Sequence, residues 1–178
     1  EKGTVKTEEE FRAKIAESLQ PQLEANADYK FMLDVRTYCE QKVGELTWPD
    51  ALLKRIMLAN NKDKGEDFVE KNYAESIKQL EWHLIKEQLV KANDIKVEDA
   101  DIKNAAKEMA RMQFAQYGMS NVPEEYVDNY ANELLKKREA VDNFIERAID
   151  VKLAAALKST VTLNNKEVTL EEFNEMMK

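Results

Sequence analysis

The feature that most constrains the fold is the stretch from Glu66 to Asn93, which carries the longest unbroken helical pattern in the chain and contains neither proline nor glycine. Apolar residues recur there at intervals of three and four, which places them on one stripe of a helix. The residues on this stripe are Val69, Tyr73, Ile77, Leu80 and Leu84, and a second stripe in the later half holds Trp82, Ile85 and Leu89. At ~1.5 Å per residue such a helix is roughly 40 Å long. We therefore expect an elongated, all-α architecture in which different parts of the chain pack along this central helix.

The amino-acid composition also favours long helices. Four glycines and three prolines among 178 residues leave little turn chemistry for a fold of many strands. Charged residues make up 35% of the chain, above the ~25% of an average domain, and so require a large solvated surface. The net charge of −8 argues against a general nucleic-acid-binding protein, and no apolar run approaches the ~18 residues of a membrane span.

Start and stop signals predict the helices on either side of the central one. Thr7 and Glu10 form a capping box at the start of a helix that Pro21 should interrupt or kink. Further helices are expected after Pro49, over 98–117, from 123, and up to about 158, the last packed against the central helix. In the tail, Asn164-Asn165 lies between two β-prone triplets and predicts a small hairpin before a last short helix.

The residues that could support catalysis are few. His83 is the only histidine, so a multi-histidine metal site is excluded, and we expect it to be a partly buried structural residue. Cys39 is the only cysteine, which excludes an intramolecular disulfide, and no histidine lies near it in sequence to act as a base. The four glycines are isolated and form no phosphate-binding loop. We therefore predict no catalytic residue, metal or cofactor for this chain.

Flexible and amphipathic apolar residues mark a candidate binding surface, because methionine, tyrosine and phenylalanine can adapt to varied apolar partners. They gather at the end of the helix predicted over 98–117 and around the turn that follows, with a smaller group after Pro49. The candidate residues are Leu52, Ile56, Met57, Met109, Met112, Phe114, Tyr117, Met119, Val122, Tyr126 and Tyr130. Any one of them also fits as ordinary core, but a small helical hairpin has no room to bury the whole set.

Two stretches carry a family resemblance. The run Leu84–Lys103, LIKEQLVKANDIKVEDADIK, together with the turn at 45–53 that contains Trp48-Pro49, resembles the C-terminal domain of bacterial trigger factor, the ribosome-associated chaperone. The ending Lys158–Met177, with its β-prone stubs and a final helix, is similar to the end of the same family. The resemblance covers essentially the whole chain.

The resemblance implies a fold and a function. In this family the domain forms the body and two helical arms of a cradle, is related in fold to the periplasmic chaperone survival protein A, and holds unfolded clients without ATP. With a hinge in the polar run 60–65, residues 1–60 would form the N-terminal helical segment with the first arm, and 61–178 the central helix, the second arm and the C-terminal helices. The implied partners are nascent or unfolded polypeptides, bound in the cytoplasm to assist folding and export, without membrane or direct nucleic-acid contact.

Other parts of the family are absent from this sequence. The ribosome-docking loop with its Gly-Phe-Arg motif does not occur, and neither does a prolyl isomerase domain of the FK506-binding type. The ribosome would thus be reached only through an N-terminal domain missing here. Three readings stay open beside the chaperone: a helical scaffold or adaptor for one folded partner, a portion of a peptidyl-prolyl cis-trans isomerase whose catalytic domain lies elsewhere, and a homodimer.

Overall fold

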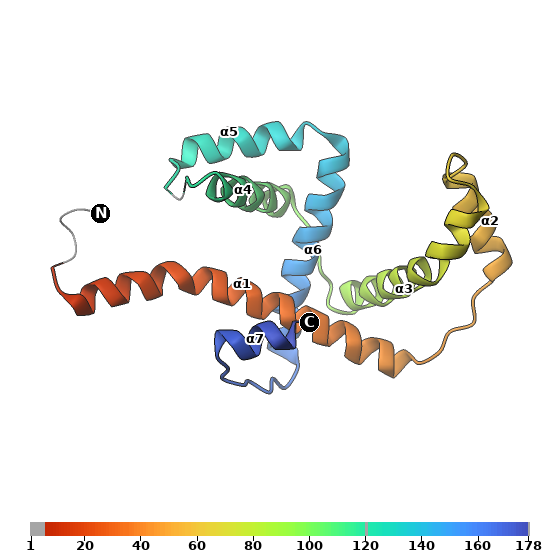
Figure 1. Ribbon diagram of the computed structural model, residues 1–178, viewed down its shortest axis with the longest axis horizontal. Coiled ribbons are helices and arrows are strands. Elements are labelled where there is room, and N and C mark those ends of the chain that lie inside the picture. Colours follow the sequence, from red (N-terminus) through yellow and green to blue (C-terminus); the bar gives the residue numbers. More distant parts are fainter. Residues whose placement is uncertain (1–5, 120, 178) are drawn as a thin grey trace. The chain divides into compact units, whose positions relative to one another are not determined.

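The structure is a computed structural model that describes residues 6–119 and 121–177. Within these ranges it contains helices and no strand, so the predicted all-α class is confirmed (Figure 1). The helices are α1 (Glu8–Val43), α2 (Asp50–Asn60), α3 (Gly65–Ala92), α4 (Asp99–Gln116), α5 (Glu124–Leu135), α6 (Arg138–Thr160) and α7 (Leu170–Met176). The chain divides into two compact units, one formed by Glu1–Ile56 with Asn164–Lys178 and the other by Met57–Leu163.

The first helix begins where the sequence predicts. The amide N–H of Glu10 donates to Oγ1 of Thr7 at 3.1 Å, and the N–H of Thr7 donates to Oε2 of Glu10 at 3.3 Å, which completes the capping box. The predicted interruption at Pro21 is wrong, because α1 continues through it to Val43. Proline has a helical φ and removes only one N–H donor. Residues 8–25 are exposed to solvent, so water can satisfy the carbonyl that loses its partner.

The central helix is confirmed as α3, which begins one residue before the predicted stretch and ends one residue before its end. It stops where the N–H of Asn93 donates to the carbonyl of Leu89 at 3.1 Å and Asp94 takes a positive φ of 46°. Of its residues, all of which are described, Val69 is fully buried, while Trp82, Ile85 and Leu89 are half-buried. The helix α6 packs on α3, as predicted.

The densest packing in the second unit lies among α4, α5 and α6. Its core consists of Ala105 and Ala106 from α4, Ala131 from α5 and Phe144 from α6. Alanine at these contacts lets the helix axes approach closely, and Phe144 fills the space that remains. Further along α6, Leu153 is completely buried, with Ala154 and Leu157 beside it in the helix. Figure 1 shows α4 and α5 side by side, with α6 leaving the end of α5.

The segment between α6 and α7 corrects one prediction. The small hairpin expected around Asn164-Asn165 is wrong, since residues 161–169 form neither strand nor helix. All of them are exposed except Val168, so the two short triplets have no third strand or apolar face to pack against, and an isolated hairpin is marginal in water. The short helix that follows is present as α7, and Thr169 and Glu172 form its capping box.

The packing of α6 gives a stability prediction. Leu153→Ala removes a completely buried side chain and should lower the free energy of unfolding by about 2–5 kcal/mol, measured by chemical denaturation. The matched control is Val151→Ala on the same helix, where the side chain is 65% exposed and the change should stay within about 0.5 kcal/mol. Equal effects of the two substitutions would contradict the assignment of Leu153 to the core.

Candidate functional site

The candidate residues of the second unit lie on a hairpin that we call the arm, formed by α4, α5 and the turn between them. The turn reverses the chain at Gly118, which has a φ of 76°, while the N–H of Met119 donates back to the carbonyl of Phe114 at 3.0 Å. Pro123 then caps the start of α5 with a φ of −56°. These local signals place the end of α4 and the start of α5 side by side at the tip of the arm.

Eight of the predicted binding residues belong to the arm, and the structure buries none of them fully. Met112, Tyr117, Met119, Tyr126 and Tyr130 are exposed, with Tyr117 at 80% and Tyr126 at 62%. Met109, Phe114 and Val122 are half-buried, and Met109 packs against the alanine core. The buried positions of the arm are occupied instead by small residues and one valine: Ala105, Ala106, Ala110, Val127 and Ala131. The fully buried space between the helices is therefore filled mainly by small side chains, with Ile102, Met109, Leu134 and Leu135 partly buried against them.

Two adjoining pockets form at the outer face of the arm. The first has a volume of about 640 Å³ and is lined by Phe114, Gly118, Met119, Asn121, Val122, Pro123 and Tyr126. The second, of about 600 Å³, is lined by Phe114, Tyr126, Asn129, Tyr130, Asn132, Glu133 and Lys136. Phe114 and Tyr126 belong to both pockets. Both are open hollows on the surface and do not enclose a ligand. Met112 and Tyr117 line neither pocket.

The aromatic residues of the arm differ in how firmly they are held. The rings of Phe114 and Tyr130 lie 5.5 Å apart between centroids with an interplanar angle of 53°, a tilted arrangement that aromatic pairs favour. The hydroxyl of Tyr130 also donates to Oε1 of Gln113 at 2.5 Å. The Phe114–Tyr130 pair thus forms a fixed floor, while the more exposed Tyr126 stands between the pockets.

The remaining predicted residues lie on α2. Leu52 and Ile56 are 50% and 47% exposed, and Met57 is half-buried. Leu52 and Ile56 belong to the first unit and Met57 begins the second. None of the three lines either pocket of the arm.

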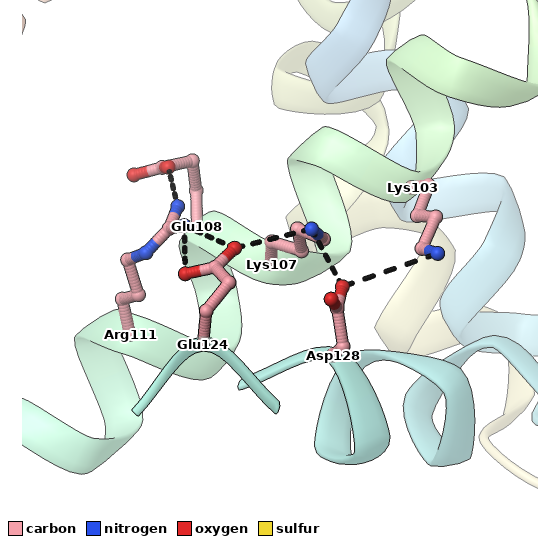
Figure 2. Close-up of polar contacts among 6 residues, drawn as sticks. All are labelled: Lys103, Lys107, Glu108, Arg111, Glu124 and Asp128. Atoms are coloured by element: carbon pink, nitrogen blue, oxygen red, sulfur yellow. Dashed lines mark hydrogen bonds and ion pairs between the residues drawn. The ribbon is translucent and has the colours of Figure 1, made fainter. Parts of the chain in front are cut away.

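An ion-pair network joins the two helices of the arm, and sequence reasoning missed it. Nη2 of Arg111 donates to both carboxylate oxygens of Glu124 at 2.8 Å, and Nζ of Lys107 lies 3.1 Å from Oε1 of Glu124 (Figure 2). Lys107 also lies 2.5 Å from Oδ1 of Asp128, and Lys103 lies 3.9 Å from the same atom. The signal was present as three bases spaced by four on α4 and two acids spaced by four on α5.

The network shifts the titration of its members. Hydrogen bonds from Arg111 and then Lys107 lower the pKa of Glu124, and Lys107 lowers the pKa of Asp128. In return, Asp128 and Glu124 raise the pKa of Lys107. Oδ1 of Asp128 is shielded from water and meets no hydrogen-bond donor in good geometry within the described residues, so the nearby ammonium groups compensate its burial electrostatically.

Three features of the described part of the chain bear on the residues considered for catalysis or metal binding. It contains no group of three or more His, Cys, Asp or Glu side chains that could hold a metal ion. Burial, and then the neighbouring Glu40, raises the pKa of the Cys39 thiol, which makes it a poor nucleophile at neutral pH. The prediction that His83 is partly buried is wrong, because it lies on the exposed face of α3 together with Glu87. No helix in the described ranges is long and apolar enough to cross a bilayer.

The described residues thus form an all-α domain with apolar side chains exposed on the arm. Residues 27–177 match the family described as probable trigger factor, C-terminal domain, and the chain belongs to this family. The curated proteins contain no significant match, and neither do the solved structures. The family gives the chain a chaperone-type role, which involves the binding of unfolded polypeptides in general, and its C-terminal domain is not a catalytic module.

The ion-pair network predicts a pH dependence for the arm. A carboxylate whose pKa is lowered on folding stabilises the folded state fully above its unfolded pKa, here 4.5 for Glu124 and 3.8 for Asp128. That stability is lost as the pH falls through the unfolded-state pKa of each carboxylate and then through its lower folded-state pKa. The test is thermal unfolding from pH 7 to pH 2.5 of the double variant Glu124→Gln with Asp128→Asn. At pH 7 its Tm should be lower than that of the unchanged protein, and its Tm should fall less than that of the unchanged protein as the pH is lowered.

Glu125→Gln is the matched control, since it removes a charge from the same turn of α5 outside the network. It should keep the pH profile of the unchanged protein. The network would be irrelevant to the arm if the double variant followed that profile as well.

Proposed function

We propose that this chain is an ATP-independent holdase that binds non-native polypeptide segments on the exposed apolar surface of the arm. The observation that carries the proposal is the set of exposed apolar side chains around the two pockets, above all Tyr126 and Met119. Apolar groups gathered on an exposed surface favour an interaction site over chance exposure. Membership of the trigger factor family supports this general role.

The chemistry of the surface suits clients of varied sequence. Methionine is flexible and polarisable, and tyrosine offers an apolar ring with a polar tip, so both adapt to different partners. The first pocket, bordered by Met119, Val122 and Pro123, would take an apolar client side chain. The second, bordered by Asn129 and Asn132, would offer amide groups to the client backbone. Together they fit an extended apolar segment whose peptide groups still need hydrogen bonds.

Further features extend the proposal. Leu52 and Ile56, both about half exposed on α2, would supply a second contact for longer clients, with Met57 beside them. The net charge of −8 opposes self-association of the exposed surface and favours basic clients. In the cell the chain would hold nascent or unfolded polypeptides in the cytoplasm and so assist their folding and export.

Aggregation suppression tests the function directly. A chemically unfolded protein is diluted into buffer with increasing amounts of this chain, without ATP, and light scattering is followed over time. We expect suppression near stoichiometric ratios with two unrelated clients. Binding of one folded partner without suppression would favour an adaptor, and acceleration of isomerisation in a short proline peptide would favour an isomerase.

A triple variant tests the site. Met112→Ser, Tyr117→Ser and Tyr126→Ser remove exposed apolar groups of the arm, so suppression should fall strongly while helicity and Tm stay nearly unchanged. The matched control makes the same change to serine at Leu84, Val151 and Val161. These residues lie elsewhere in the second unit and are 39%, 65% and 44% exposed. Like the test set, the control has two helical residues and one helix C-cap.

The control variant should suppress aggregation as the unchanged protein does. A collapse of Tm in the first variant would mean that its three residues belong to the core. Equal loss of suppression in both variants would mean that the arm is not the specific site.

A further inference from the structure

A nearly buried lysine connects α3 to α6 within the second unit. The side chain of Lys86 is 11% exposed, and its Nζ donates to Oε2 of Glu146 at 2.5 Å and to Oδ1 of Asp150 at 3.2 Å. The two carboxylates lie one turn apart on α6 and are each about half exposed. A single ammonium group from α3 therefore spans one turn of α6.

A second lysine, Lys152 of α6, contacts the segment that connects α3 to α4. Nζ of Lys152 on α6 donates to the carbonyl of Lys96 at 2.8 Å and lies 2.5 Å from Oδ2 of Asp101. Asp101 in turn accepts the N–H of Glu98 at 2.8 Å and so caps the start of α4. The connection from α3 to α4 is thus bound to α6, and the point at which α3 ends is held in place.

Near Lys86, α3 and α6 share little buried apolar surface, so the polar contacts of Lys86 form a large part of the contact between the two helices. The helices α4, α5 and α6 share a core of fully buried side chains, whereas the fully buried residue of α3 is Val69, near the opposite end of that helix. At the junction Ile85 and Leu89 are only half-buried. Burial alone would lower the pKa of Lys86, but Glu146 and Asp150 outweigh it and raise the pKa, so the ammonium group stays charged at neutral pH.

We propose that Lys86 is a positioning residue that sets the direction in which α3 leaves α6. That direction fixes the separation between the far end of α3, at the turn 61–64, and the tip of the arm. The inference rests on the proposed function in one respect. The carbonyl of Met57, one of the proposed contact residues, accepts a hydrogen bond from Asn61 of that turn at 2.9 Å, so a client that contacts both Met57 and the tip gains affinity only if the separation is held. A short client bound at the tip alone gains nothing from it.

The geometry is tested without any client. Spin labels are placed at Asp63→Cys and Gln116→Cys, both exposed and both in the second unit, in the full chain with Cys39→Ser. Pulsed electron paramagnetic resonance should give one narrow distance distribution for this protein. Lys86→Met keeps the apolar stem and removes the charge, and it should shift or broaden that distribution.

Two further variants make the result interpretable. Glu146→Gln with Asp150→Asn neutralises both partners of Lys86 from the half-exposed side of α6, so Lys86 keeps amide acceptors but loses its ion pairs; it should alter the distribution in the same direction even if Lys86→Met fails to fold. Lys91→Met is the matched control, because Lys91 lies on the same helix, is 62% exposed and pairs with Glu87 of its own helix at 2.8 Å. An unchanged distribution in the folded Lys86 and α6 variants would overturn the proposal.

The link to binding uses two probes, a short fluorescent peptide with one tryptophan and reduced, carboxymethylated α-lactalbumin as a permanently unfolded chain. Lys86→Met should weaken binding of the long chain about tenfold or more and leave peptide binding unchanged. Equal affinities for the long chain before and after substitution would overturn the positioning role. Failure of the proposed function itself is distinguishable, since neither probe would then bind the unchanged protein.

Discussion

Buried alanines set the distance between the helices of the arm, and the position of each larger apolar side chain there follows from that distance. Ala106, Ala110 and Ala131 are fully buried, so α4 and α5 pack closely, and a larger side chain such as the half-buried Met109 packs against this core without being fully enclosed. The larger residues must then lie along the outer edges. Tyr117 and Tyr126 are exposed for this reason, and the arm keeps a complete core without using its aromatic residues.

Ionic contacts join helices that share a buried core, as α4 and α5 do, and also helices that share little buried apolar surface, as α3 and α6 do. Exposed ion pairs contribute only about 0–1 kcal/mol each, so such contacts are weak sources of stability. Their value lies in geometry, because Arg111 grips both oxygens of Glu124 and Lys86 spans two carboxylates of α6. One set of charges therefore joins α4 to α5 in the arm, and a different set joins α3 to α6.

The sequence predicted what depends on local chemistry and missed what depends on the relation between elements. The capping box of Thr7 and the long α3 follow from spacing within one helix, and both are present. The interruption at Pro21 and the hairpin at Asn164 failed because their outcome depends on solvent access and on a pairing partner. The candidate surface was named from residue type, but its pairing of Arg111 with Glu124 requires the register of two helices, which no single segment contains.

Under the proposed function, the surface of the arm would have to adapt to varied clients while its helices stay in place. Phe114 and Tyr130 are fixed by their ring contact and by the hydrogen bond to Gln113, so the floor of the pockets loses little freedom when a client binds. Met119 and Tyr126 at the rim keep the mobility that different side chains demand. The tyrosine hydroxyls keep the rim hydrated between binding events, and the net charge of −8 holds copies of the chain apart. Under this proposal the adaptable residues are the exposed ones, whereas the alanine core is fully buried and the ion pairs join α4 to α5.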